Sequence, residues 1–279
     1  MSPATLPANA GTEPNLGDAP AARAPRRYTA RTYFFIMAMI SLVSIIGTTI
    51  LAISQPSLAV TPDPATNGAV MVTFQVLSFF TVLSNILVPV TGFMLARDPN
   101  RTGRIFRVIH FDALIMITVT GIVYAVILAP LAHPVGLNVY FNAGLHYIAP
   151  PMFVLGWALF GPRPTFSFKL LGQSLIIPGL WVTYTLIHGA IIGWYPYPFL
   201  NVEKLGYGTV GINLVVITMA AMLIGAMYLG FGSMAARIKT RRDTELVGKD
   251  AAAPPVADDA AIVNLQDSQE NATRELIAR

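Results

Sequence analysis

Six long apolar segments, separated by short polar ones, dominate the pattern of hydrophobic and polar positions along the chain. They cover residues 33–54, 69–96, 109–131, 139–160, 169–193 and 208–231. Each segment holds about the 20 residues that an α-helix needs to cross roughly 30 Å of hydrocarbon. Barrel strands would instead show short segments of alternating hydrophobicity. The pattern therefore predicts an all-α polytopic membrane protein, with a six-transmembrane-helix bundle in residues 31–237.

The two ends of the chain are polar and are expected to lie outside this bundle. Residues 1–30 are rich in Ala and Pro and lack an apolar core, which predicts a disordered arm and argues against a cleavable signal peptide. Residues 238–279 begin with basic side chains and are then expected to be disordered, with a short amphipathic piece at 260–266 as the alternative. No internal repeat or inverted duplication is visible in the sequence.

Lysine and arginine positions predict how the bundle is oriented. They gather before the first segment, after the second, after the fourth and after the sixth, whereas the alternate loops hold only Lys204. The gathered residues are Arg23, Arg26, Arg27, Arg31, Arg97, Arg101, Arg104, Arg107, Arg163, Lys169, Arg237, Lys239, Arg241 and Arg242. Because loops rich in Lys and Arg stay in the cytoplasm, both termini are expected to be cytoplasmic.

Composition supports the membrane class and excludes several functions. Of the 279 residues 54% are hydrophobic and only 11% are charged, and the mean hydropathy is +0.60, whereas soluble domains carry about 25% charged residues. The basic residues flank the apolar segments, so the pI of about 9.4 indicates contact with membrane lipids and not with nucleic acid. The chain has no cysteine, which excludes disulfides and Cys-ligated metals.

Polar residues inside the apolar segments are the candidates for chemistry, because they are costly in lipid. In the second segment Ser78, Thr81 and Asn85 follow an i, i+3, i+7 spacing and share one helix face. In the fourth, Asn142 and His146 are four residues apart, and His is able to act as a base near neutral pH. The common alternative is that such residues only bond within their own helix or tie two helices together.

The fifth segment ends in an aromatic cluster. Trp181, Tyr184 and His188 lie on one predicted helix face, and the cluster continues with Trp194, Tyr195 and Tyr197, with two prolines among them. This cluster is either an irregular cap over the helix ends or an ordinary aromatic belt at the membrane surface. His188 and His146 fall at similar predicted depths, so we expect Thr81, His146 and His188 to converge as a hydroxyl with a base.

Asp112 is the single carboxylate inside a predicted span. It lies near the cytoplasmic start of the third segment, far in depth from His146. We expect it to pair with Arg104 or Arg107 and to have a structural role.

Several segments together resemble the androgen-induced-gene family of membrane hydrolases. They are Phe79-Phe80-Thr81, the stretch from Asn142 to His146 followed by Pro150, and His188 with the downstream Tyr197-Pro198-Phe199-Leu200. The resemblance covers roughly residues 33–231 in order. His188 matches after a one-residue shift, and Ala143 stands where family members often have a second histidine.

The resemblance implies a hydrolase of fatty-acid esters of hydroxy fatty acids or of similar lipid esters. Thr81 would be the nucleophile and His146 its base, without a metal or organic cofactor. Asn85 and Asn142 are candidate oxyanion donors by residue type, and His188, Trp181 and the tyrosines of the cluster would support or bind the substrate. The plain loops are typical of a bacterial-type member in the cytoplasmic membrane.

Two functions of other classes remain open at this point. One is a non-enzymatic membrane protein that binds or transports lipids or small molecules, which the Pro-interrupted fourth segment favours. The other is a haem protein with His146 and His188 as ligands. A zinc site would normally need a third protein ligand, which the sequence does not offer.

Overall fold

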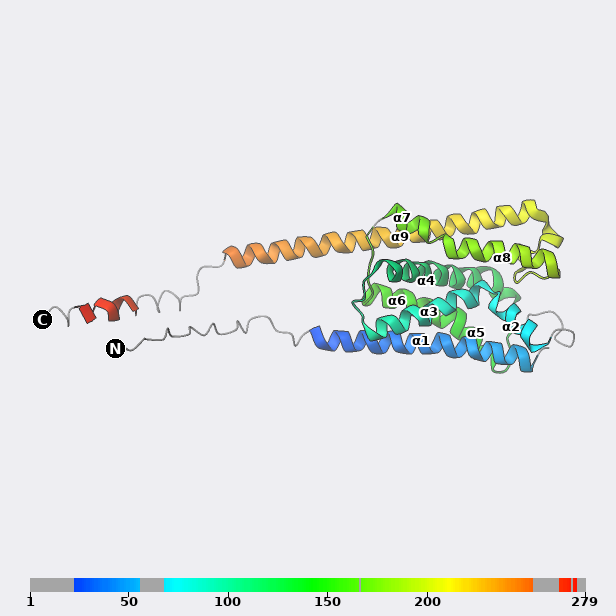
Figure 1. Ribbon diagram of the computed structural model, residues 1–279, viewed down its shortest axis with the longest axis horizontal. Coiled ribbons are helices and arrows are strands. Elements are labelled where there is room, and N and C mark those ends of the chain that lie inside the picture. Colours follow the sequence, from blue (N-terminus) through cyan, green and yellow to red (C-terminus); the bar gives the residue numbers. More distant parts are fainter. Residues whose placement is uncertain (1–22, 56–67, 166, 253–265, 272, 275–279) are drawn as a thin grey trace, which may run out of the picture. The chain divides into compact units, whose positions relative to one another are not determined.

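The computed structural model describes residues 23–55, 68–165, 167–252, 266–271 and 273–274, and among these residues it contains helices and turns but no strand (Figure 1). The all-α prediction is therefore confirmed. The chain divides into two compact units, Met1–Phe231 and Gly232–Arg279. The first unit holds every candidate residue.

The helical elements follow one another in a simple order. They are α1 (Arg23–Ser54), α2 (Ala69–Leu77), α3 (Phe80–Arg97), α4 (Arg104–Val123), the π-helix η3 (Tyr124–Leu128), the 3-10 helix η4 (Ala129–Leu131), α5 (Asn138–Ala143), the π-helix η5 (Gly144–Ile148), α6 (Ala149–Leu159), α7 (Phe168–Gln173), α8 (Ile176–Ile192), the 3-10 helix η6 (Pro198–Leu200) and α9 (Val202–Ala252).

Within the described residues, five helical stretches are long and apolar enough to cross a membrane. They are Arg27–Ser54, Phe80–Arg97, Arg104–Leu131, Phe168–Ile192 and Val202–Glu245. Large apolar side chains such as Ile50, Ile191 and Met219 are exposed on α1, α8 and α9, where a water-soluble protein would expose only small apolar patches. These helices are compatible with a multi-pass membrane protein. The fourth expected segment is helical from 138 to 159, but it is divided among α5, η5 and α6.

Several predicted boundaries differ from the structure. Residues 69–96 do not form one helix, because α2 ends at Leu77 and α3 begins at Phe80, and 169–193 is likewise divided after Gln173. The prediction of a disordered arm is wrong for residues 23–30, which belong to α1. Pro25 is compatible with this helix because it stands in the first turn, where the backbone N–H that proline lacks would have no partner within the helix. The first 22 residues lie outside the described part.

The predicted disordered tail is also wrong in part. Helix α9 continues to Ala252, and residues 266–271 are helical as well. Of the suggested amphipathic piece at 260–266, only the last residue is described.

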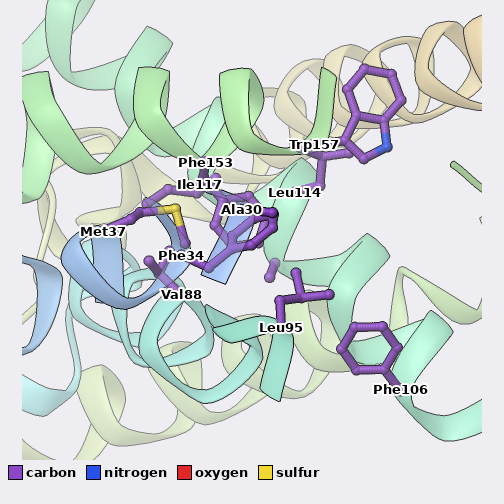
Figure 2. Packing of buried hydrophobic residues seen from close by; sticks show 11 residues of the cluster. Ala30, Phe34, Met37, Val88, Leu95, Phe106, Leu114, Ile117, Phe153 and Trp157 are labelled. Atoms are coloured by element: carbon purple, nitrogen blue, oxygen red, sulfur yellow. The ribbon is translucent and has the colours of Figure 1, made fainter. Parts of the chain in front are cut away.

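The core of the first unit packs α1, α3, α4 and α6 against one another. Phe34 and Met37 from α1 meet Val88 from α3, Leu114 from α4 and Phe153 from α6 (Figure 2). Each of these side chains is almost fully buried. The candidate residues on α3, η3 and η5 therefore sit on a packed framework and not on mobile loops.

Both π-helices precede a proline, and both lie beside the candidate site. Proline has no N–H, so the regular hydrogen bond to the residue four positions earlier is lost at Pro130 and at Pro150. The N–H groups of Ala129 and Ala149 instead donate to the carbonyls of Tyr124 and Gly144, five positions earlier. Such wide turns bulge a helix and change the direction of its side chains.

Candidate active site

The break between α2 and α3 places the start of a helix inside the bundle. Phe79 is extended (φ −69°, ψ 132°), and Thr81 is the second residue of α3. The first N–H groups of a helix have no partner within it and carry partial positive charge. The N–H of Thr81 donates to the Tyr197 hydroxyl at 3.1 Å. Thr81 thus lies at the positive end of the α3 helix dipole.

Side chains of α8 satisfy the polar groups that the break exposes. The Trp181 indole N–H donates to the Ser78 carbonyl at 2.8 Å, and the Tyr184 and Ser78 hydroxyls are 2.7 Å apart. The break contains no Gly or Pro, the usual causes of a helix interruption. The hydrogen bonds from Trp181 and Tyr184 of α8 stabilise the break.

Thr81 and His146 form a hydroxyl–imidazole pair. The His146 Nε2 atom is 3.3 Å from Thr81 Oγ1, and His146 Nδ1 is 3.0 Å from the Asn142 carbonyl oxygen. A carbonyl oxygen only accepts hydrogen bonds, so in neutral His146 the proton is on Nδ1 and the lone pair of Nε2 faces Thr81. The Thr81 hydroxyl donates to Nε2, which is the direction that a nucleophile and its base require.

Tyr124 and Asn142 hold the imidazole of His146 in place. The Tyr124 ring stacks on it with centroids 3.7 Å apart and an angle of 20°. The Asn142 amide donates to the Tyr124 hydroxyl at 2.6 Å. The sequence did not single out Tyr124, because a tyrosine near the end of an apolar segment is typical of a membrane-surface belt.

Asn85 supports the backbone behind Thr81. Its amide donates to the Thr81 carbonyl (2.9 Å) and to the Leu145 carbonyl (3.1 Å), and its oxygen accepts from the Ser41 hydroxyl (2.9 Å). Both amide hydrogens are used, so Asn85 has none left for a substrate. It joins α1, α3 and η5, the element that carries His146.

A cavity of about 350 Å³ lies over the Thr81–His146 pair. A second cavity of about 90 Å³ also reaches Thr81. Three residues, Thr81, Leu128 and Tyr197, line both cavities, whereas His146 and Asn142 line only the larger one. Trp181 lines only the smaller one. Thr81 therefore lies where the two cavities, called chambers below, meet.

The structure does not bring His188 to the pair. Its ring stacks on Tyr184 at 5.2 Å and meets Trp194 edge-on at 6.3 Å, and it lines neither cavity. Tyr195 is buried against Gly189, where an added Cβ would overlap its ring, and it also lies outside both cavities. Of the aromatic cluster, Tyr197 is the residue that touches Thr81.

The predicted ion pair of Asp112 is wrong. Asp112 is buried, whereas Arg104 and Arg107 are exposed, and no ion pair joins them in this described region. One of its carboxylate oxygens has no hydrogen-bond partner. The carboxylate faces the packed interior of the bundle, out of reach of these arginines.

The arrangement combines a hydroxyl, an oriented base, a helix N-terminus and an apolar cavity. Over the residues that the structure places, no three His, Cys, Asp or Glu side chains are grouped to hold a metal ion. Comparisons of the chain with protein-family models, with curated proteins and with solved structures find no match. The chemistry of the site is therefore argued from its own geometry.

Proposed function

We propose that the protein is an intramembrane hydrolase of lipid esters, such as fatty-acid esters of hydroxy fatty acids, with Thr81 as nucleophile and His146 as base. The observation that carries the proposal is the 3.3 Å approach of His146 Nε2 to Thr81 Oγ1 beside a largely apolar cavity. The resemblance of Phe79-Phe80-Thr81 and of the stretch ending in His146 to the androgen-induced-gene family supports it. The reaction needs no metal or organic cofactor.

The proposed reaction proceeds in two halves. Thr81 Oγ1 attacks the ester carbonyl while its proton passes to His146 Nε2, which gives a tetrahedral oxyanion. The intermediate collapses to an acyl-threonine, and His146 returns the proton to the departing alkoxide, which leaves as the alcohol. A water molecule then gives a proton to His146 and attacks the acyl group. Collapse releases the carboxylic acid and restores the Thr81 hydroxyl.

The Tyr197 hydroxyl is the proposed oxyanion donor. Its oxygen accepts from the Thr81 N–H, while its nearest acceptor, Thr81 Oγ1, is 3.4 Å away. The phenolic hydrogen is thus only weakly engaged before substrate binds. It is able to turn toward the oxyanion that forms next to Oγ1.

Replacing Tyr197 with phenylalanine is expected to lower kcat for ester hydrolysis by about 10²-fold, the usual cost of losing one oxyanion donor. The KM is expected to change little, since the ring still fills the same space. Steady-state kinetics on a soluble short-chain ester measure both constants. The matched control is Tyr207→Phe, on an exposed tyrosine outside both cavities. A Tyr197→Phe variant with wild-type kcat contradicts the assignment.

We further propose six membrane spans with both termini in the cytoplasm, in a bacterial cytoplasmic membrane. The helical continuity of residues 138–159 supports a sixth crossing beside the five long apolar stretches. The alternation of Lys and Arg along the loops supports the orientation. A lipid ester would then enter the cavity from the bilayer.

The test of the function is hydrolysis of a panel of lipid esters by the purified full chain in lipid nanodiscs. The panel contains branched esters of hydroxy fatty acids, glycerides and simple alkyl esters. An alkyl fluorophosphonate is added in a parallel sample, and the modified residue is found by peptide mass spectrometry. Hydrolysis together with a label on Thr81 supports the proposal. No hydrolysis and no label would favour a lipid-binding protein, a function that the two cavities also suit.

A further inference from the structure

The two chambers that meet at Thr81 differ in their chemistry. The larger one carries the base and two asparagines, Asn138 and Asn142. The smaller one is walled mainly by aliphatic side chains of α4 and α9. Of its polar residues, Thr120 and Ser174 are already hydrogen-bonded, to Ser84 and to the Leu171 carbonyl. Away from Thr81 and Tyr197, the smaller chamber therefore offers an ester mainly apolar contacts.

Ester hydrolysis fixes which part of the substrate lies near the base. The alkoxide that departs must take a proton from His146, so the alcohol portion lies in the chamber that His146 lines. The carbonyl carbon is bonded to Oγ1 of Thr81 in the intermediate, and its acyl chain leaves that carbon in another direction. The water that releases the acyl group must also reach His146, so it enters through the chamber that the alcohol has vacated.

Given the hydrolase function proposed above, we propose that the smaller cavity, between α4, α8 and α9, is the acyl-chain site and that the larger cavity is the site of the alcohol portion and of the hydrolytic water. The acyl-threonine intermediate then holds its chain away from the entering water. The lining residues of the smaller cavity then determine selectivity for the acyl chain, and those of the larger cavity determine selectivity for the alcohol. A substitution in one cavity alters selectivity for one part of the ester alone.

The smaller cavity extends away from Thr81 along two helices. Its lining runs from Ile115 to Val123 on α4 and from Leu214 to Met222 on α9. In each case the end residues are eight positions apart, which corresponds to about 12 Å at a helical rise of 1.5 Å per residue. Leu214 packs beside Tyr197 at the Thr81 end, whereas Ala221 packs with the cluster around Ile115. A larger side chain at Ala221 therefore shortens the chamber from its far end.

Ala221→Phe and Ala132→Phe test the assignment together, because each is expected to impair one ester series and spare the other; we call this outcome the crossed pattern. Ala221 lines only the smaller cavity and Ala132 only the larger one, and both are half-buried, so the larger ring has room to fit. The full chain in nanodiscs is assayed with two ester series. In the first the acyl chain grows from acetyl to octanoyl on a fixed small alcohol, and in the second the alcohol grows on a fixed acetyl group. Ala220→Phe is the matched control, because Ala220 is exposed and lines neither cavity.

Ala221→Phe is expected to lower kcat/KM for the longest acyl chains by about tenfold or more, the scale of a lost apolar pocket contact. Its activity on the alcohol series and on acetyl esters is expected to stay within about twofold of wild type. Ala132→Phe is expected to show the opposite pattern. Reversed patterns, or equal losses in both series, overturn the assignment.

Failure of the hydrolase function itself is distinguishable from failure of this assignment. A wild-type protein that cleaves no ester in either series overturns both proposals. Thr81-dependent hydrolysis without the crossed pattern overturns only the assignment of the chambers. A thermal unfolding profile of each variant, compared with Ala220→Phe, shows whether a loss of activity reflects misfolding.

Discussion

Thr81→Ala is expected to lower kcat for ester hydrolysis by about 10³-fold or more, because it removes the oxygen that is the proposed nucleophile. Thr81→Ser keeps an attacking hydroxyl and should retain measurable turnover. The Thr81 hydroxyl makes only long contacts, of 3.3 Å to His146 and 3.4 Å to Tyr197. The alanine variant should therefore fold normally. The measurements are kcat in nanodiscs, thermal unfolding and fluorophosphonate labelling.

Thr73→Ala is the matched control for this substitution. Thr73 is a helical threonine whose hydroxyl bonds the Ala69 carbonyl of its own helix, and it lines neither cavity. Its replacement is expected to leave hydrolysis unchanged. A Thr81→Ala protein that hydrolyses esters at the wild-type rate would remove the nucleophile from the proposal. A folded variant that still binds lipid but no longer hydrolyses esters would separate catalysis from binding.

The segments that form the helices were predictable because length and hydrophobicity are local properties of the sequence. The break before Thr81 was not, because neither Gly nor Pro marks it. Its polar groups are satisfied by Trp181 and Tyr184, about a hundred positions further along the chain. A pattern of periodicity carries no information about such a distant partner. The helix N-terminus that faces the site therefore appears only in three dimensions.

The sequence paired Thr81 with His146 but did not predict what orients the imidazole. The i, i+4 spacing of Asn142 and His146 placed both on one face, yet it is the Asn142 carbonyl that bonds Nδ1. The Asn142 side chain instead holds Tyr124. Tyr124 and His146 both lie in π-helices, which the apolar pattern of the sequence does not reveal.

His188 was expected at the site because its depth matched that of His146. Depth alone does not fix lateral position. His188 lies one helical turn beyond Tyr184, the residue that already contacts Ser78 in front of the break. It therefore packs among Tyr184 and Trp194, beyond the level of Thr81. A haem held between His146 and His188 is also disfavoured, because both ring nitrogens of His146 face partners within the protein.

His146→Gln is expected to lower kcat by about 10²- to 10⁴-fold, the usual contribution of a positioned general base. Glutamine is polar and of similar reach, but its amide does not take up the Thr81 proton. If Thr81 and His146 act as one unit, as proposed, the double variant with Thr81→Ala should be no slower than Thr81→Ala alone. Steady-state kinetics on all three variants measure this coupling.

The control for His146→Gln is His133→Gln, at an exposed position after η4, which should leave kcat unchanged. If the two losses at Thr81 and His146 multiplied in the double variant, the residues would act independently. Tyr197 would then be the better candidate for the group that activates Thr81, because it is the other side chain that contacts the Thr81 hydroxyl. Losses that do not multiply would instead show that Thr81 and His146 act together. The Nε2 lone pair would then be the group that activates Thr81. The Asn142 carbonyl and the stacked Tyr124 ring orient that lone pair toward Thr81.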